Sequence, residues 1–157
     1  MNPSEIRTQL KVNNVIYFTL LCGLIIFFIL GVILIQNKSL EVNTEVDKIF
    51  TFIIPVFGLV MMFISRMIYN QMISKVDSKD DLIEKISYYR TAKIISWAII
   101  EGASLFTFAA TILTSNYLYV AVFIFLFGYF ILMIPSNESL IRDMRLNSDE
   151  SNLILKS

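Results

Sequence analysis

Glu101 lies inside residues 94–113, a run of about 20 residues with no other ionisable side chain, which is long enough to cross a lipid bilayer. Inserting a carboxylate at the centre of a transmembrane helix costs at least about 2.5 kcal/mol on scales derived from membrane insertion. Charged residues at such positions usually face other protein or water-filled space, and they mark binding or ion-conducting sites. Glu101 is therefore the first candidate for a functional residue.

The composition of the chain is typical of an integral membrane protein. Hydrophobic residues make up 56% of its 157 residues, and the mean hydropathy of +0.69 is too high for an ordinary soluble domain. Four runs have the length of transmembrane helices, at 15–35, 49–69, 94–113 and 117–134. The sequence predicts an all-α fold, in which four transmembrane helices form one bundle within the lipid bilayer.

Several classes of function are excluded by residues that the chain lacks. The formal net charge is zero and no Lys/Arg-rich run occurs, so we expect no nucleic-acid binding. Without histidine and with the single cysteine Cys22, the usual zinc sites, histidine-ligated haem and histidine-activated nucleophiles are excluded. Ser104 has no base to activate it, and Glu101 has no second acid beside it. We expect neither an enzyme nor a resident metal or cofactor.

The distribution of basic residues predicts the orientation of the helices. Basic residues precede the first helix, surround the connection between the second and third helices, and follow the fourth helix. They are Arg7, Lys11, Arg66, Lys75, Lys79, Lys85, Arg90, Lys93, Arg142 and Arg145. The other two connections hold only Lys38 and Lys48, which acidic neighbours balance. Because basic residues stay on the cytoplasmic side, we expect both termini there, in a bacterial inner (cytoplasmic) membrane.

The connection between the second and third helices is predicted to be helical. Asp77 to Asp81 carry side chains that cap helices, and no glycine or proline follows before Gly102, so 78–93 should form a cytoplasmic stalk that extends the third helix. We expect the apolar face of this stalk to pack on something. That face consists of Leu82, Ile83, Ile86 and Tyr89.

The residues after the fourth helix predict a short amphipathic helix at 136–146 and a loose tail at 147–157. The short helix carries Leu140, Ile141 and Met144 on one face. It could lie at the headgroup boundary of the bilayer or pack on the stalk, and the sequence leaves both alternatives open.

Arg66 is a second charged residue at membrane depth, in the second helix. With segment centres taken as the midplane, Glu101 lies about 4 Å and Arg66 about 10 Å toward the cytoplasm. Each side chain leans toward the N-terminus of its own helix, so antiparallel helices bring the two toward one depth. Two interpretations remain open, an ion pair that fixes helix register, or an ion-binding Glu101 with Arg66 extended to the interface. Ser104 is a further candidate for either site.

Small residues recur beside Glu101 at helical spacing, which permits close approach of another helix. They serve either packing inside the bundle or association with a second copy of the chain. These helix-packing candidates are Ala98, Gly102, Ala103 and Ala109.

The segment AIIEGASLF at 98–106 resembles the carboxylate-bearing helix of the rotor c subunits of proton- or sodium-driven ATPases. The resemblance implies that Glu101 binds the transported ion. The glycine-repeated partner helix of those subunits has no counterpart, because the second helix contains only Gly58. Their polar Arg-Gln-Pro loop is missing too. As a whole, the chain resembles small four-helix bacterial membrane proteins.

Together these features predict two alternative functions. The first is an accessory or scaffold subunit of a membrane complex, which binds a protein partner or a second copy of itself through the stalk and the helix surfaces. The alternative is a proton- or ion-handling membrane subunit that uses Glu101.

Overall fold

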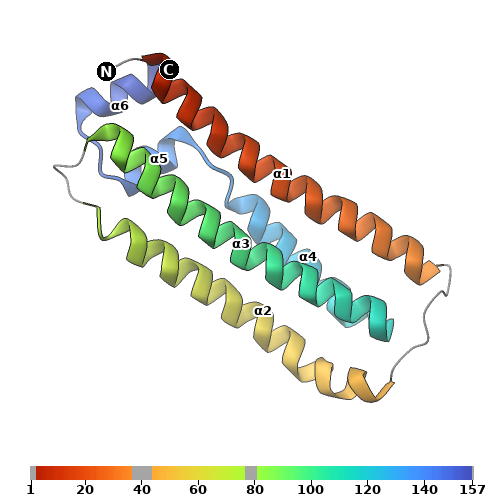
Figure 1. Ribbon diagram of the computed structural model, residues 1–157. Coiled ribbons are helices and arrows are strands. Elements are labelled where there is room, and N and C mark those ends of the chain that lie inside the picture. Colours follow the sequence, from red (N-terminus) through yellow and green to blue (C-terminus); the bar gives the residue numbers. More distant parts are fainter. Residues whose placement is uncertain (1–2, 37–43, 77–80, 157) are drawn as a thin grey trace.

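A computed structural model describes residues 3–36, 44–76 and 81–156, and within these ranges all regular structure is helical. This confirms the all-α fold class. The helices are α1 (Pro3–Gln36), α2 (Thr44–Ile73), α3 (Leu82–Thr114), α4 (Tyr117–Leu132), α5 (Asn137–Asp143) and α6 (Ser148–Lys156). Figure 1 shows α1 to α4 aligned in an elongated bundle, with α5 and α6 at the end where α1 begins. We call this the terminal end and the opposite one the far end.

Three helices, α1, α2 and α3, are long and apolar enough to cross a membrane. α4 meets the same criterion only together with α5, to which it is joined through a bend of 79°. α1 and α2 begin before the predicted runs 15–35 and 49–69, because helical structure continues into their polar ends. Pro55 lies inside α2 without ending it.

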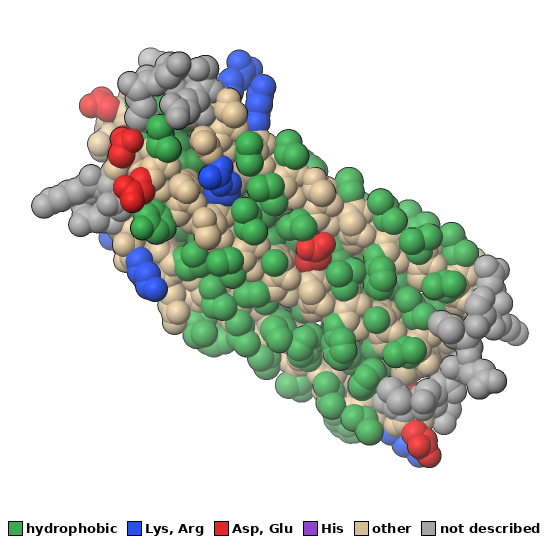
Figure 2. All heavy atoms as spheres, viewed as in Figure 1, with side chains coloured by type: hydrophobic (Ala, Val, Ile, Leu, Met, Phe, Trp, Pro, Cys, Tyr) green, Lys and Arg blue, Asp and Glu red, His purple; other side chains and the backbone are tan. Residues whose placement is uncertain are grey.

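α3 is the central helix, since it packs against α1, α2 and α4 (Figure 1). Half of its most apolar stretch is buried, against 11% in α1 and 17% in α2. The outer helices instead expose large apolar side chains such as Ile26, Phe52 and Phe63. Figure 2 shows hydrophobic side chains over most of the visible side of the bundle and charged ones mainly at its ends. This distribution fits a bundle whose sides meet lipid rather than water.

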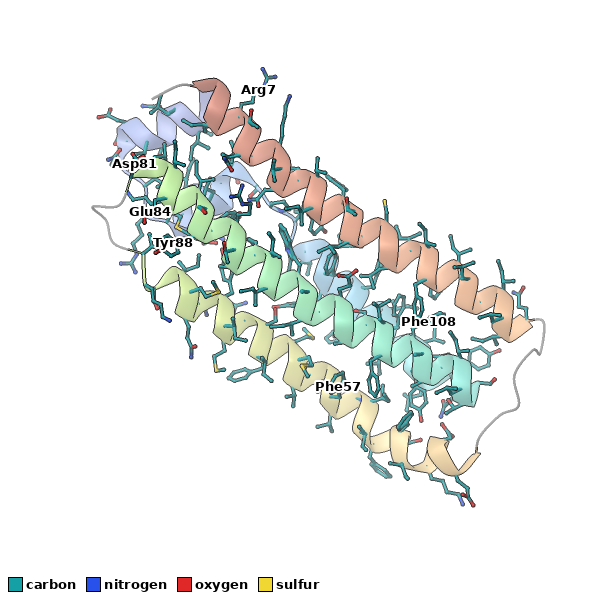
Figure 3. The ribbon with its side chains drawn as sticks, in the orientation of Figure 1. Arg7, Phe57, Asp81, Glu84, Tyr88 and Phe108 are labelled. Carbon is teal, nitrogen blue, oxygen red and sulfur yellow. The ribbon has the colours of Figure 1, made fainter. Side chains whose placement is uncertain are left out.

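Aromatic rings fill the space between α1, α3 and α4. Phe108 of α3 is fully buried, and its ring centre lies 5.0 Å from those of Phe28 in α1 and Phe123 in α4. α1 approaches α3 closely at this level, because a Cβ atom added to Gly31 would lie 2.1 Å from the Phe108 ring. Figure 3 labels Phe108 on α3, together with Phe57 of α2, whose ring packs against Phe106.

Carbonyl groups at the end of α4 accept hydrogen bonds from side chains of neighbouring helices, in addition to the backbone bonds from Met133 and Ile134. The Tyr17 hydroxyl of α1 donates to the carbonyls of Phe130 and Ile131, at 3.1 and 3.2 Å. The Trp97 indole N–H of α3 donates to the carbonyl of Met133 at 3.1 Å. These bonds hold the end of α4 against α1 and α3.

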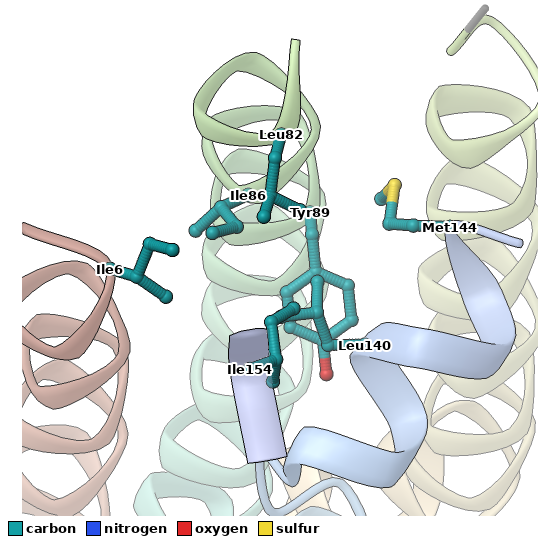
Figure 4. Close-up of a cluster of buried hydrophobic side chains, with 7 residues drawn as sticks. All are labelled: Ile6, Leu82, Ile86, Tyr89, Leu140, Met144 and Ile154. Carbon is teal, nitrogen blue, oxygen red and sulfur yellow. The ribbon is translucent and has the colours of Figure 1, made fainter. Parts of the chain in front are cut away.

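The stalk is covered by other parts of the same chain. α3 is unbroken from Leu82 to Thr114, so 82–93 is continuous with the membrane helix, while 78–80 lies outside the described residues. Leu82, Ile86 and Tyr89 are buried in a cluster that Figure 4 presents. The residues that complete this cluster, from α1, α6 and the region of α5, are Ile6, Leu140, Met144 and Ile154. Three of the four apolar residues of the stalk face are thus covered by the chain itself.

The C-terminal residues differ from the expected loose tail, because α6 spans Ser148–Lys156. Asn147 and Glu150 cap this helix reciprocally, each side chain accepting a hydrogen bond from the backbone N–H of the other. Glu150 also forms an ion pair of 2.8 Å with Lys85 of the stalk. The short helix predicted at 136–146 corresponds to α5. Of the two alternatives for it, the structure shows packing on the stalk, since Leu140 lies in the same cluster as the stalk residues.

Candidate functional site

Glu101 lies on the side of α3 that faces α1. A Cβ atom added to Gly23 of α1 would come 3.7 Å from Glu101 Oε1, so the carboxylate is directed at a glycine. The side chain is partly exposed, and no hydrogen bond or ion pair joins it to another described residue. Figure 2 shows an acidic side chain among hydrophobic ones midway along this face. The carboxylate is therefore available to a group from outside the described chain.

The structure does not bring Arg66 to Glu101, which corrects the ion-pair interpretation. The ion pairs between described residues are Lys85–Glu150 and Arg142–Asp143. The contact of α2 with α3 at this level runs through Ser65 and Ser96, whose hydroxyl oxygens lie 2.6 Å apart. Glu101 follows Ser96 by five residues and is rotated about 140° from it around α3. A similar depth in the membrane is therefore not sufficient for an ion pair between Arg66 and Glu101, because Glu101 is turned away from α2.

Ser104 is not joined to Glu101 by a hydrogen bond. Its side chain is fully buried, and its hydroxyl donates to the carbonyl of Ile100 at 2.8 Å. This is the local bond that serine commonly makes inside a helix. Ser104 therefore satisfies its donor within α3.

The small residues of α3 divide between the inside and the outside of the bundle. Ala103 is buried and Ala109 is partly buried, whereas Ala98 and Gly102 are exposed. A Cβ atom added to Gly102 would meet nothing within 4 Å. On α1, Cys22 and Gly23 are also exposed. We call the exposed residues beside the carboxylate, together with it, the Glu101 face: Cys22, Gly23, Ala98, Glu101 and Gly102.

A second group of polar residues gathers at the terminal end (Figure 1). Arg66, Lys93 and Arg142 line a cavity there, together with Tyr69 and Asp143. These residues come from α2, α3 and α5, and only the fold brings them together. The signal present in the sequence was the combination of basic and aromatic residues near the ends of the apolar runs, which is typical of membrane interfaces.

The comparisons with known proteins add no assignment. No family model, no curated protein and no solved structure matches the chain. The likeness of residues 98–106 to rotor c subunits therefore stays a prediction from the sequence. Within the described ranges, no group of three His, Cys, Asp or Glu side chains is arranged to hold a metal ion.

Proposed function

We propose that the chain is a small integral membrane protein whose helices α1 to α4 all cross the bilayer. In this proposal it has no catalytic turnover and acts as an accessory or scaffold subunit of a membrane complex. A transmembrane helix of the partner docks on the Glu101 face. The observation that carries the proposal is a carboxylate at mid-membrane depth that has no partner among the described residues and is bordered by exposed small residues.

The energetics of lipid favour an occupant on this face. A lone carboxylate in hydrocarbon carries an insertion cost of at least about 2.5 kcal/mol, which a donor from another helix reduces. Polar contacts between membrane helices contribute about 0.6 kcal/mol on average and up to about 1.7 kcal/mol. Gly23 and Gly102 allow a second helix to approach closely. The expected partner helix carries a basic, amide or hydroxyl side chain near its middle.

The burial of the stalk's apolar residues favours partner docking on the side of the helix bundle over docking on the stalk. Because α5, α6 and the start of α1 bury Leu82, Ile86 and Tyr89, the stalk retains little apolar surface for a partner. The exposed part of Glu101, in contrast, is accessible from the side of the bundle. A docking role at the Glu101 face therefore agrees better with the packing than a role at the stalk.

The alternative function, proton or ion handling, is favoured by one observation. Arg66 forms no ion pair with Glu101 in the described structure, so no fixed positive charge opposes the exchange of a proton or cation at this carboxylate. Glu101→Gln separates the two functions, because glutamine keeps the shape and hydrogen-bonding capacity of the side chain without titrating. Ion handling predicts proton or sodium flux into proteoliposomes that this variant abolishes. Docking predicts no flux from the purified chain.

Cross-linking in native membranes tests the docking proposal. A photoreactive residue at Ala98 should form an adduct of one defined mass, while the same probe at Phe63, exposed on α2, should react only with lipid. Gly102→Leu should abolish the adduct at Ala98, because the larger side chain fills the approach path. Ala121→Leu introduces the same side chain at an exposed position on α4 and should leave the adduct intact.

Two outcomes would contradict the proposal. An adduct with the mass of two copies of this chain would assign the Glu101 face to self-association. Equal adducts at Ala98 and Phe63, insensitive to Gly102→Leu, would mean that the face has no specific occupant.

A further inference from the structure

A cavity of about 580 Å³ lies at the terminal end, between α2, α3, α4 and α5. Arg66 and Tyr69 reach it from α2, Lys93 from α3, and Arg142 and Asp143 from α5. Lys93 precedes Glu101 by eight residues, or about 12 Å along the helix. The cavity is therefore a site separate from the Glu101 face.

Positive charge exceeds negative charge in this cavity. Among the described residues, its charged lining consists of three cations and the single carboxylate of Asp143. That carboxylate is already engaged, because Oδ2 accepts a hydrogen bond from the Tyr69 hydroxyl at 2.6 Å and Oδ1 accepts one from Arg142 Nε at 3.0 Å. Arg66 and Lys93 have no carboxylate partner among the described residues. The arrangement favours an anionic ligand.

Lys93 is the residue that most requires such a ligand. Its side chain is only 9% exposed, and Nζ lies 4.9 Å from the ring centre of Tyr69 and 5.4 Å from that of Tyr89. These cation–π contacts stabilise the charge but provide no acceptor for its N–H groups. No hydrogen bond joins the ammonium to a described residue. A phosphate oxygen in the cavity would supply the missing acceptor, and the planar guanidinium of Arg66 could bind a second one.

The position of the cavity identifies the source of the phosphate. Leu132 and Met133, at the end of α4, form part of its lining, and the chain bends by 79° between α4 and α5 just beyond them. Leu132, which lines the cavity, is 81% exposed, so apolar surface adjoins the polar cavity. Basic pockets of this kind between membrane helices bind lipid headgroups. The apolar surroundings suit acyl chains.

We infer that this cavity binds the phosphate headgroup of an anionic phospholipid. Lys93 and Arg66 hold the phosphate, Tyr69 and Arg142 engage the Asp143 carboxylate through hydrogen bonds, and the acyl chains lie along the surface beside Leu132. A free phosphate would use the same donors but not the apolar surface.

The test uses the full-length chain in a neutral detergent, titrated with phosphatidylglycerol or with phosphatidylcholine of the same acyl chains. Binding is counted by native mass spectrometry, and thermal unfolding is followed in parallel. Phosphatidylglycerol should bind and raise the unfolding temperature, whereas phosphatidylcholine should do so far less. Arg66→Gln should weaken phosphatidylglycerol binding by about fivefold, as expected for one basic residue at a lipid phosphate. Because Arg66 is exposed, this variant should fold normally.

The matched control is Lys75→Gln, which removes the same charge just beyond the end of α2, from an exposed residue outside the cavity. It should leave phosphatidylglycerol binding within about twofold of the original. Equal losses in the two variants would reduce the effect to general surface charge and overturn the proposal. Equal binding of the two lipids would overturn it as well. A full thermal shift from inorganic phosphate or glycerol phosphate alone would assign the cavity to a soluble anion.

Discussion

Gly31 and Gly102 are both in long helices, but their surroundings differ. A Cβ atom at residue 31 would lie 2.1 Å from the buried Phe108 ring, whereas one at residue 102 would meet nothing within 4 Å. Gly31→Ala should therefore lower the free energy of unfolding by about 1 to 3 kcal/mol through overpacking. Gly102→Ala should raise it by about 0.5 to 1 kcal/mol through helix propensity. Reversible unfolding in detergent measures both, and a Gly31→Ala variant as stable as the original protein would contradict the close α1–α3 contact.

Tyr17 tests the hydrogen bonds that close the end of α4. Tyr17→Phe removes the hydroxyl that donates to the carbonyls of Phe130 and Ile131, and it should cost about 1 kcal/mol of stability. Tyr117→Phe is the matched control, because Tyr117 is 79% exposed at the far end. Equal stability of the two variants, measured by the same unfolding experiment, would show that the bonds to α4 contribute nothing.

At the scale of elements, α6 and the stalk depend on each other. Lys85 is 3% exposed, and its ion pair with Glu150 joins the stalk to α6. Glu150→Gln removes the negative charge that this buried ammonium needs, and it should destabilise the protein by about 2 kcal/mol. Asp149→Asn, one residue earlier and exposed, should have almost no effect. Amide hydrogen exchange should also locate the loss of protection in α6. Exchange spread evenly over the bundle would argue against this docking.

The helices were predicted from the sequence to different extents. Apolar runs long enough to cross the hydrocarbon core of a bilayer indicate a helix by themselves, so the sequence readily predicts the helix at 94–113. α6 was missed because its apolar residues are few, although the spacing of Asn147 and Glu150 carries a capping signal. The sequence also predicts the apolar face of the stalk, but a helical repeat does not indicate which residues cover that face. Only the tertiary structure shows that Leu140 and Ile154 pack on it.

At the scale of the whole molecule, the candidate site was predicted in part. Burial cost alone singled out Glu101, and depth along the membrane normal made Arg66 a reasonable partner. Depth is one coordinate, however, and the pairing also requires the two side chains to face each other around their helix axes. The contact of Ser65 with Ser96 sets that rotation, and nothing in the apolar runs indicates it.

The basic residues predict the orientation of the molecule. We predict that the terminal end, with Arg7, Lys75 and Arg145, is cytoplasmic. After replacement of Cys22, a cysteine at the exposed Ser74 should resist a membrane-impermeant maleimide in intact cells. A cysteine at the exposed Tyr117, at the far end, should react. The reverse pattern of labelling would overturn the orientation.

Glu101 has no hydrogen-bond or ion-pair partner among the described residues and is available to another molecule. A double-mutant cycle of Glu101→Gln and Arg66→Met, measured as unfolding free energies in detergent, tests this claim most directly. Because the structure leaves these two side chains unpaired, the coupling energy should be zero within about 0.3 to 0.5 kcal/mol. A coupling of about 1 kcal/mol or more, the size expected for a polar pair between membrane helices, would contradict it.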